Sequence, residues 1–117
     1  CFASRECYTA IGKIPNEIRL AGGGSQAKVL REIFSSVLKV TIRTSNRTES
    51  AAAGAAMIGA MALGIYKDWN SCIEDWVDPL LGKLEKNNKN LVQVYDDVYD
   101  IYLDSRNRIQ PIWEKIN

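Results

Sequence analysis

The sequence predicts an α/β fold in which helices alternate with short strands. Apolar residues recur at helical spacing in some segments and β-branched residues gather in others, in the order helix, strand, glycine loop, helix, strand, helix. That order is typical of βαβ connections, which pair successive strands in parallel. Two strands do not make a self-sufficient sheet, so we expect further strands from outside this sequence or from a second copy of it.

The composition excludes several classes of function. The 117 residues include 15 Lys and Arg against 14 Asp and Glu, for a net charge of +1, and no His. Without His, the sequence contains no Ser-His-Asp or Cys-His catalytic site and no His-containing metal site. A net charge of +1 provides no electrostatic basis for binding nucleic acid, which needs a clustered basic surface.

The opening segment Cys1–Ile11 has apolar residues at helical spacing but no N-cap residue before them. It also lacks the features of a signal peptide, so we expect a chain cut from within a larger protein. The cysteines are Cys1, Cys7 and Cys72, an odd number without CxxC spacing. They are predicted to be reduced thiols that pack as small hydrophobic residues in a cytoplasmic protein.

The first predicted strand, Ile18–Ala21, follows a turn at 12–16 that contains Gly and Pro, and it leads directly into a run of glycines. A helix is predicted over Gln26–Val37, where apolar residues recur at helical spacing. The β-branched run Val40–Arg43 predicts the second strand.

The longest apolar run, Ala51–Ile65, predicts a helix that Asn46 or Thr48 caps. It is shorter than the roughly 20 residues that a helix needs to cross a membrane. Rows of Ala and Gly along it allow close approach to a neighbouring element. We therefore expect a buried helix and not a membrane anchor.

The last part of the sequence predicts a short helix, a linker and a long helix. The short helix is Ser71–Val77, ended by an Asp-Pro pair. The polar run Lys83–Lys89 predicts a solvated linker within a connecting region at 82–90. The long helix is expected over 90–116, with Pro111 kinking or ending it. Its inner face is expected to comprise Leu91, Val94, Tyr95, Val98, Tyr102, Ile109, Ile112 and Trp113.

The glycines after the first strand are the motif with chemical content. Gly22, Gly23 and Gly24 let the backbone approach a ligand without side-chain interference, and Ser25 follows them near the helix start. Free N–H groups at a helix start bind an anion or the polar edge of a ligand. The motif matches neither GxGxxG nor a phosphate-binding P-loop, and a tight turn without a ligand explains it equally well.

Residues 18–66 resemble the carboxy-terminal domain of the FGGY family of carbohydrate kinases. The matching elements are the first strand, Gly22–Gly24, the helix that ends in Ser35–Leu38, the second strand, and Glu49 before the Ala-rich helix. The helices at both ends also suit the family, so the resemblance extends over 1–117 as part of a carboxy-terminal nucleotide-binding domain. Within the family, the sequence most resembles the erythritol and L-xylulose kinase-like branch.

The resemblance implies a kinase that transfers a phosphoryl group from ATP to a hydroxyl of a small sugar or polyol. It also implies a ribonuclease-H-like fold, shared with actin and the heat-shock ATPases. The residues that would bind the adenosine of ATP or ADP are Gly22, Gly23, Gly24, Ser25 and Ala27. Because Ala27 stands where the family often has Ser or Asn, adenine binding would rely on the backbone and on packing.

In the family, the catalytic Asp, the phosphate-binding loops, the sugar pocket and most of the Mg²⁺ ligands belong to the amino-terminal part. Phosphoryl transfer needs these groups, so this chain alone is predicted to be inactive. The alternative from another class is a stand-alone, non-catalytic interaction or regulatory domain of the same fold. Self-association is expected in either case, because an incomplete sheet exposes a strand edge.

Three other features have simpler structural explanations. Asp96, Asp97 and Asp100 spell DDxxD, the metal-diphosphate motif of isoprenoid synthases, but such enzymes need a large all-helical cavity and a second metal motif. A solvated acidic face opposite the tyrosines is favoured. Lys28, near the glycines, is also expected on a solvated helix face. The tryptophans are expected to contact the core or another domain; they are Trp69, Trp76 and Trp113.

Overall fold

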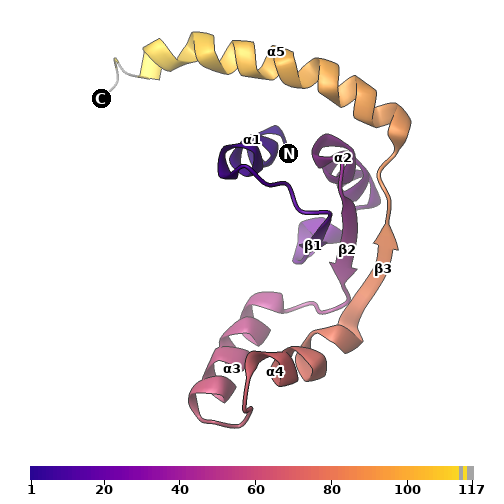
Figure 1. The fold of residues 1–117 in the computed structure, drawn as a ribbon, viewed down its shortest axis with the longest axis vertical. Helices are drawn as coiled ribbons and strands as arrows, with labels where there is room; N and C mark the ends of the chain where they lie inside the picture. The colour runs from indigo at the N-terminus through magenta and orange to yellow at the C-terminus, as the bar shows by residue number, and fades with distance from the viewer. Residues whose placement is uncertain (114, 116–117) are drawn as a thin grey trace.

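The computed structural model describes residues 1–113 and 115 and has the predicted α/β class (Figure 1). In chain order the elements are α1 (Phe2–Ile11), β1 (Glu17–Leu20), η1 (Gly23–Gln26), α2 (Lys28–Leu38), β2 (Thr41–Ser45), α3 (Ser50–Ala62), α4 (Trp69–Trp76), η2 (Asp78–Leu80), β3 (Leu81–Glu85) and α5 (Lys89–Trp113). The short elements η1 and η2 are 3₁₀ turns. The helix order and the first two strands therefore agree with the sequence pattern.

The three strands form one sheet in the order β1-β2-β3. β1 and β2 are parallel, with Ile18 opposite Ile42, and α2 makes the crossover between them. This parallel pair confirms the βαβ expectation. Among the described residues, β1 has no strand partner on its other side.

The third strand corrects the predicted linker. β3 pairs antiparallel with β2, so the expected solvated run Lys83–Lys89 begins inside the sheet. At Gly82 a Cβ atom would lie 2.5 Å from Thr44 Oγ1, so glycine permits the close approach of the two strands. The sequence LGKLE contains no β-branched residue, which is why its strand character was not recognised.

The core lies between α2 and the sheet. Leu38, Val40 and Ile42 form a fully buried cluster, and Tyr8, Ile18, Leu20 and Phe34 pack against it. The carboxyl-terminal half of α2 is buried, while Val29 and Leu30 near its start are exposed. The strong one-sided apolar pattern of this helix explains its position on the sheet.

The face that α5 turns inward agrees with the predicted one only in part. Of the predicted set, Leu91, Tyr95 and Tyr102 are half-buried, and the rings of Tyr95 and Tyr102 lie beside Phe2 of α1. Tyr99, not in the predicted set, is buried, and the ring of Phe2 in α1 lies 5.6 Å from its ring centroid. Val94 and Val98, assigned to the inner face, are 52% and 41% exposed. Apolar residues occur on both sides of this helix, so spacing placed Tyr95 and Tyr102 correctly on the side that meets α1 but wrongly added Val94 and Val98 to it. Ile109, Ile112 and Trp113 are also exposed.

The acidic row on α5 is only partly solvated. Asp97 and Asp100 are exposed as expected, but Asp96 forms ion pairs with Lys39 at 2.7 Å and with Arg5 at 2.8 Å. The hydrogen bond from Lys39 is the main cause of a lowered pKa for Asp96, and the Arg5 contact adds to it against partial burial. Asp96 therefore ties α5 to α1 and to the end of α2.

Three further expectations are wrong for this chain. Among the described residues of α3, Ala60 is the buried one, so the Ala-rich helix is largely exposed. Its N-cap position is Glu49, and no side-chain cap bond from Asn46 or Thr48 forms. Of the cysteines, Cys72 is buried as predicted, whereas Cys1 and Cys7 are exposed.

Pro111 lies in the last turn of α5, and residues 114 and 116 of the predicted helix lie outside the described residues.

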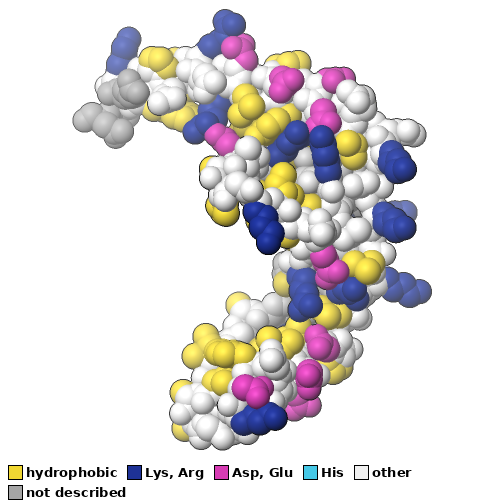
Figure 2. Space-filling model, viewed as in Figure 1, with side chains coloured by type: hydrophobic (Ala, Val, Ile, Leu, Met, Phe, Trp, Pro, Cys, Tyr) yellow, Lys and Arg dark blue, Asp and Glu magenta, His cyan; other side chains and the backbone are white. Residues whose placement is uncertain are grey.

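The molecule is an open arc with α5 at one end and the α3–α4 pair at the other (Figure 1). Its radius of gyration is 18.0 Å, against about 13 Å for a compact domain of this length. Its accessible surface is 8203 Å², against about 6,400 Å² for a compact monomer of the same mass. Figure 2 shows hydrophobic side chains on the surface of the α3–α4 end, where Ile58, Leu63 and Ile65 are exposed.

Candidate functional site

The candidate site lies where β1 and β2 end. Because these strands are parallel, their carboxyl ends share one edge of the sheet, which is where open α/β sheets bind ligands. The glycine turn follows β1 and the segment Asn46–Thr48 follows β2. The two segments together line a solvent-open cavity of about 320 Å³, whose lining residues are Gly22, Gly23, Gln26, Asn46, Arg47 and Thr48.

Gly22 shapes the turn through its backbone. Its φ of 86° and ψ of 176° lie in a region that essentially only glycine occupies. At Gly24 a Cβ atom would lie 3.3 Å from Leu30 Cδ2, whereas at Gly23 it would meet open space. Glycine therefore suits the three positions for different reasons. Gly22 needs a backbone conformation that other residues avoid, Gly24 has little room for a side chain beside Leu30, and Gly23 leaves its backbone uncovered toward the cavity.

Ser25 and Ala27 hold the turn and do not line the cavity. Ser25 is buried; its hydroxyl donates to the Gly22 carbonyl at 2.7 Å, and its N–H donates to the same oxygen at 3.1 Å. Ala27 occupies the N-cap of α2 without a capping side chain, and its N–H donates to the Gly24 carbonyl at 3.2 Å. Of the five predicted site residues, the structure brings Gly22 and Gly23 to the cavity.

Arg31 connects the turn to β3. Its Nη1 donates to the carbonyl oxygens of Ser25 and Gln26 at 2.8 and 3.0 Å. Its Nε lies 3.0 and 2.9 Å from the two carboxylate oxygens of Glu85. No signal in the sequence pairs these residues, because they are 54 positions apart.

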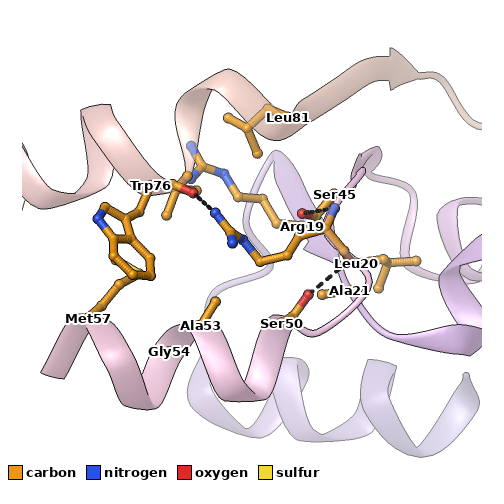
Figure 3. Close-up of a pocket in the computed structure, with 12 residues that line it drawn as sticks. Arg19, Leu20, Ala21, Ser45, Ser50, Ala53, Gly54, Met57, Trp76 and Leu81 are labelled. Carbon is orange, nitrogen blue, oxygen red and sulfur yellow. Dashed lines mark hydrogen bonds between the residues drawn. The ribbon is translucent and has the colours of Figure 1, made fainter. Parts of the chain in front are cut away.

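Arg47 carries a positive charge and lines both this cavity and a neighbouring cavity. Its Nη2 donates to the Trp76 carbonyl at 2.5 Å, and its guanidinium carbon lies 5.7 Å from the Trp76 ring centroid. The neighbouring cavity, of about 180 Å³, is mostly apolar and lies between the sheet edge, α3 and α4 (Figure 3). Trp76 points toward Met57 of α3 there. Arg47, Gln26, Asn46 and Thr48 were not singled out as site residues from the sequence.

A short chain of hydrogen bonds supports Trp76. Trp76 Nε1 donates to the Tyr66 hydroxyl at 2.8 Å, and that hydroxyl donates to Asp75 at 2.6 Å. The bond to Asp75 is the main cause of a raised pKa for Tyr66, because it favours the protonated phenol. These bonds hold the end of α4 against the segment that joins it to α3.

Other residues considered in the sequence lie away from the cavity. Lys28 is exposed, as expected, and lines a separate surface hollow beside Glu85. Trp69 and Trp113 are exposed. Among the residues that the structure describes, no three His, Cys, Asp or Glu side chains are grouped closely enough to hold a metal ion. Within the same part of the chain, no helix combines the length and apolarity that crossing a bilayer requires.

Comparison with known proteins identifies the family. The model of the C-terminal domain of the FGGY family of carbohydrate kinases matches residues 1–63. The chain belongs to the FGGY family of carbohydrate kinases. This confirms the resemblance inferred from the glycine turn and the elements that follow it.

Two curated relatives place this FGGY chain in the erythritol and xylulose kinase-like branch. The erythritol kinase of Brucella abortus (strain 2308) is 39% identical over 114 residues, which is 97% of this chain and 22% of that protein. The xylulose kinase of Staphylococcus xylosus is 32% identical over 89 residues, which is 74% of this chain and 18% of that protein. The FGGY chain thus spans about a fifth of the length of these relatives.

Solved structures confirm the fold. A ligand-bound xylulose kinase from Lactobacillus acidophilus matches 99% of this FGGY chain with a TM-score of 0.80 and 19% identity, and the match covers 24% of that structure. A gluconate kinase from the same organism matches 90% of the chain with a TM-score of 0.73 and 21% identity, covering 21% of that structure. The chain therefore has the fold of the corresponding part of sugar kinases.

Proposed function

We propose that this chain is the nucleotide-binding portion of an ATP-dependent carbohydrate kinase that phosphorylates a hydroxyl of a small sugar or polyol. One observation carries the proposal: the glycine-only backbone of Gly22 opens the strand-end cavity, next to Arg47, in a chain of the FGGY family. A cavity at this edge suits a nucleotide, because backbone N–H groups and a cation both bind phosphate oxygens.

Each predicted site residue has a role in this proposal. Gly22 and Gly23 bring uncovered backbone to the adenosine and its phosphates, and Gly24 keeps the turn close to Leu30. Ser25 holds the turn through the Gly22 carbonyl. Ala27 leaves the start of α2 without a capping side chain, so its N–H groups are available to a polar ligand edge.

The remaining parts of the reaction belong outside this sequence. Phosphoryl transfer needs metal-held phosphates and a base at the acceptor hydroxyl. In this proposal ATP is a substrate that this chain helps to bind, Mg²⁺ is held mainly by residues outside it, and the chain alone does not catalyse. The erythritol and xylulose kinase relatives support a four- or five-carbon polyol or ketose as acceptor. The proposal includes a cytoplasmic location, which rests on the expectation of reduced thiols.

The test uses the complete protein that contains this sequence. Calorimetric titration with ADP should show binding, and Gly22→Ala should weaken it by at least about tenfold, or about 1.4 kcal/mol. Gly12→Ala is the matched control, because Gly12 also has a positive φ, 78°, but ends α1 away from the cavity. A coupled assay with erythritol, xylulose and gluconate identifies the acceptor. Absence of ADP binding, or equal ADP affinity in Gly22→Ala and the parent protein, would show that the proposal is wrong.

A further inference from the structure

We propose that Arg31 is a positioning residue: its guanidinium clamps the glycine turn to β3 and so holds the turn in its nucleotide-binding shape. The inference deepens the proposed function, and its expected effect on nucleotide affinity rests on that function. Arg31 acts on the backbone of the turn and does not line the cavity itself.

The first step is the geometry of the clamp. One guanidinium reaches two kinds of acceptor at once: the carbonyls of Ser25 and Gln26 through Nη1, and the carboxylate of Glu85 through Nε. The Arg31 side chain is only 15% exposed. A charge with so little contact with water is stable only with such partners, so its orientation is well determined.

The second step is that the turn needs external support. η1 is a single turn of four residues, bounded by backbone bonds from Ser25 N–H to the Gly22 carbonyl and from Ala27 N–H to the Gly24 carbonyl. Three consecutive glycines also lose more conformational entropy on folding than other residues. Fixing the carbonyls of Ser25 and Gln26 at the far end of the turn restricts the directions in which the Gly22–Gly24 backbone points.

The third step is that β3 is itself firmly placed. β3 pairs with β2, with Glu85 opposite Ile42. Just beyond it, Asn88 donates from its side chain to Glu32 at 2.9 Å, and its backbone N–H donates to Ser36 Oγ at 3.3 Å. Glu85 is therefore a fixed anchor, and Arg31 transmits that placement to the turn.

Arg43, on β2, provides a matched control for Arg31, on α2. Its Nε lies 3.0 Å from Glu17 Oε1, and its Nη1 donates to the Gly82 carbonyl at 3.4 Å. The pair has half-buried partners like the Arg31 pair but does not touch the glycine turn. Arg43→Lys thus removes a comparable fork of hydrogen bonds without affecting the turn directly.

The experiment compares Arg31→Lys with Arg43→Lys in the complete protein. Lysine keeps the charge but cannot bond both carbonyls and the carboxylate in the same geometry. Hydrogen exchange of peptides covering 21–27 should speed up by about tenfold in Arg31→Lys and by less than about twofold in Arg43→Lys. The ADP dissociation constant and the KM for ATP should rise by about fivefold to tenfold in Arg31→Lys alone, with kcat and the KM for the sugar unchanged.

Glu85→Gln tests whether the anchor acts through Arg31. Alone it should speed exchange in the turn, and in the Arg31→Lys background it should add less than about twofold. The clamp is overturned if Arg31→Lys and Arg43→Lys give the same exchange in 21–27 and the same ADP affinity. If the parent protein binds no ADP, the proposed function fails, and the exchange comparison still decides whether Arg31 holds the turn.

Discussion

The two helices that follow the parallel strands differ sharply in how they pack. α2 follows β1, and its last four residues, Ser35, Ser36, Val37 and Leu38, are buried. α3 follows β2 and buries Ala60 alone among its described residues. The reason is in their sequences: α2 has one apolar side, whereas α3 is apolar or small on every side. A helix of the second kind is normally covered all round by a larger protein.

In this chain a helix is buried only where other elements of the same sequence can pack against it. α2 finds its partners within the chain, because α1, β2 and α5 pack against it. α3 meets α4 and lines the apolar cavity of about 180 Å³, and most of its other residues are exposed. Figure 2 shows hydrophobic side chains on the surface of this end of the molecule. The expectation of a buried Ala-rich helix was wrong for this chain, and the open arc and large accessible surface agree with the small share of its relatives that it spans.

The largest expected effect separates these two regions directly. Leu38→Ala should lower the free energy of unfolding by about 3 kcal/mol, because it leaves a cavity in the core. Leu63→Ala, just after α3, should change it by less than about 0.5 kcal/mol, because Leu63 is 80% exposed whereas Leu38 is 1% exposed. Urea denaturation of the chain measures both. Equal losses would mean that the α3 region is packed as tightly as the core.

An intermediate effect is expected where the two regions join. Arg47→Gln removes the hydrogen bond to the Trp76 carbonyl and the contact with the Trp76 ring. The loss should be about 1–2 kcal/mol, because a half-buried carbonyl loses a charged donor. Tryptophan fluorescence during denaturation reports it. Arg108→Gln is the control, since its pair with Asp104 is highly exposed and should contribute little; a comparable loss there would contradict the assignment.

The smallest effect concerns pH and the packed region. The pKa of Asp96 is lowered in the folded chain, chiefly by Lys39 and then by Arg5. A lowered folded pKa stabilises the fold above the unfolded pKa, near 3.8, and this stabilisation is lost as pH falls through the folded value. Asp96→Asn should remove about 1 kcal/mol at neutral pH and reduce the acid dependence.

The control for this pH effect is Asp104→Asn, because the Asp104 side chain is largely exposed and pairs with Arg108 of the same helix. Stability of both variants is measured by denaturation at a series of pH values from neutral to acid. An unchanged acid dependence in Asp96→Asn would contradict the role of the Lys39–Asp96–Arg5 contacts.

A smaller part of the candidate site could be predicted from the sequence, and the rest could not, for a physical reason. Gly22 and Gly23 were found because glycines between a strand and a helix are a local signal. Arg47 escaped notice because its position in the cavity depends on the parallel pairing of β1 with β2. Arg31 could not be singled out from the sequence, because its partner Glu85 is 54 positions away in the chain.

By itself, the sequence determined the elements with a clear local pattern. The strand expected at Ile18–Ala21 is observed at Glu17–Leu20, the helix expected at Gln26–Val37 at Lys28–Leu38, and that expected at Ser71–Val77 at Trp69–Trp76. Periodicity and β-branched content act within a few neighbouring residues, so they can be read without the fold.

Tertiary structure alone decided which surfaces meet. β3 exists because a run without β-branched residues pairs with the free edge of β2, and Gly82 allows that approach. On α5, the structure buries Tyr99 beside Phe2 and leaves the predicted Val94 and Val98 exposed, because both sides of the helix carry apolar residues. Contacts between residues distant in the chain depend on the whole arrangement, and local preference is too weak to select among them.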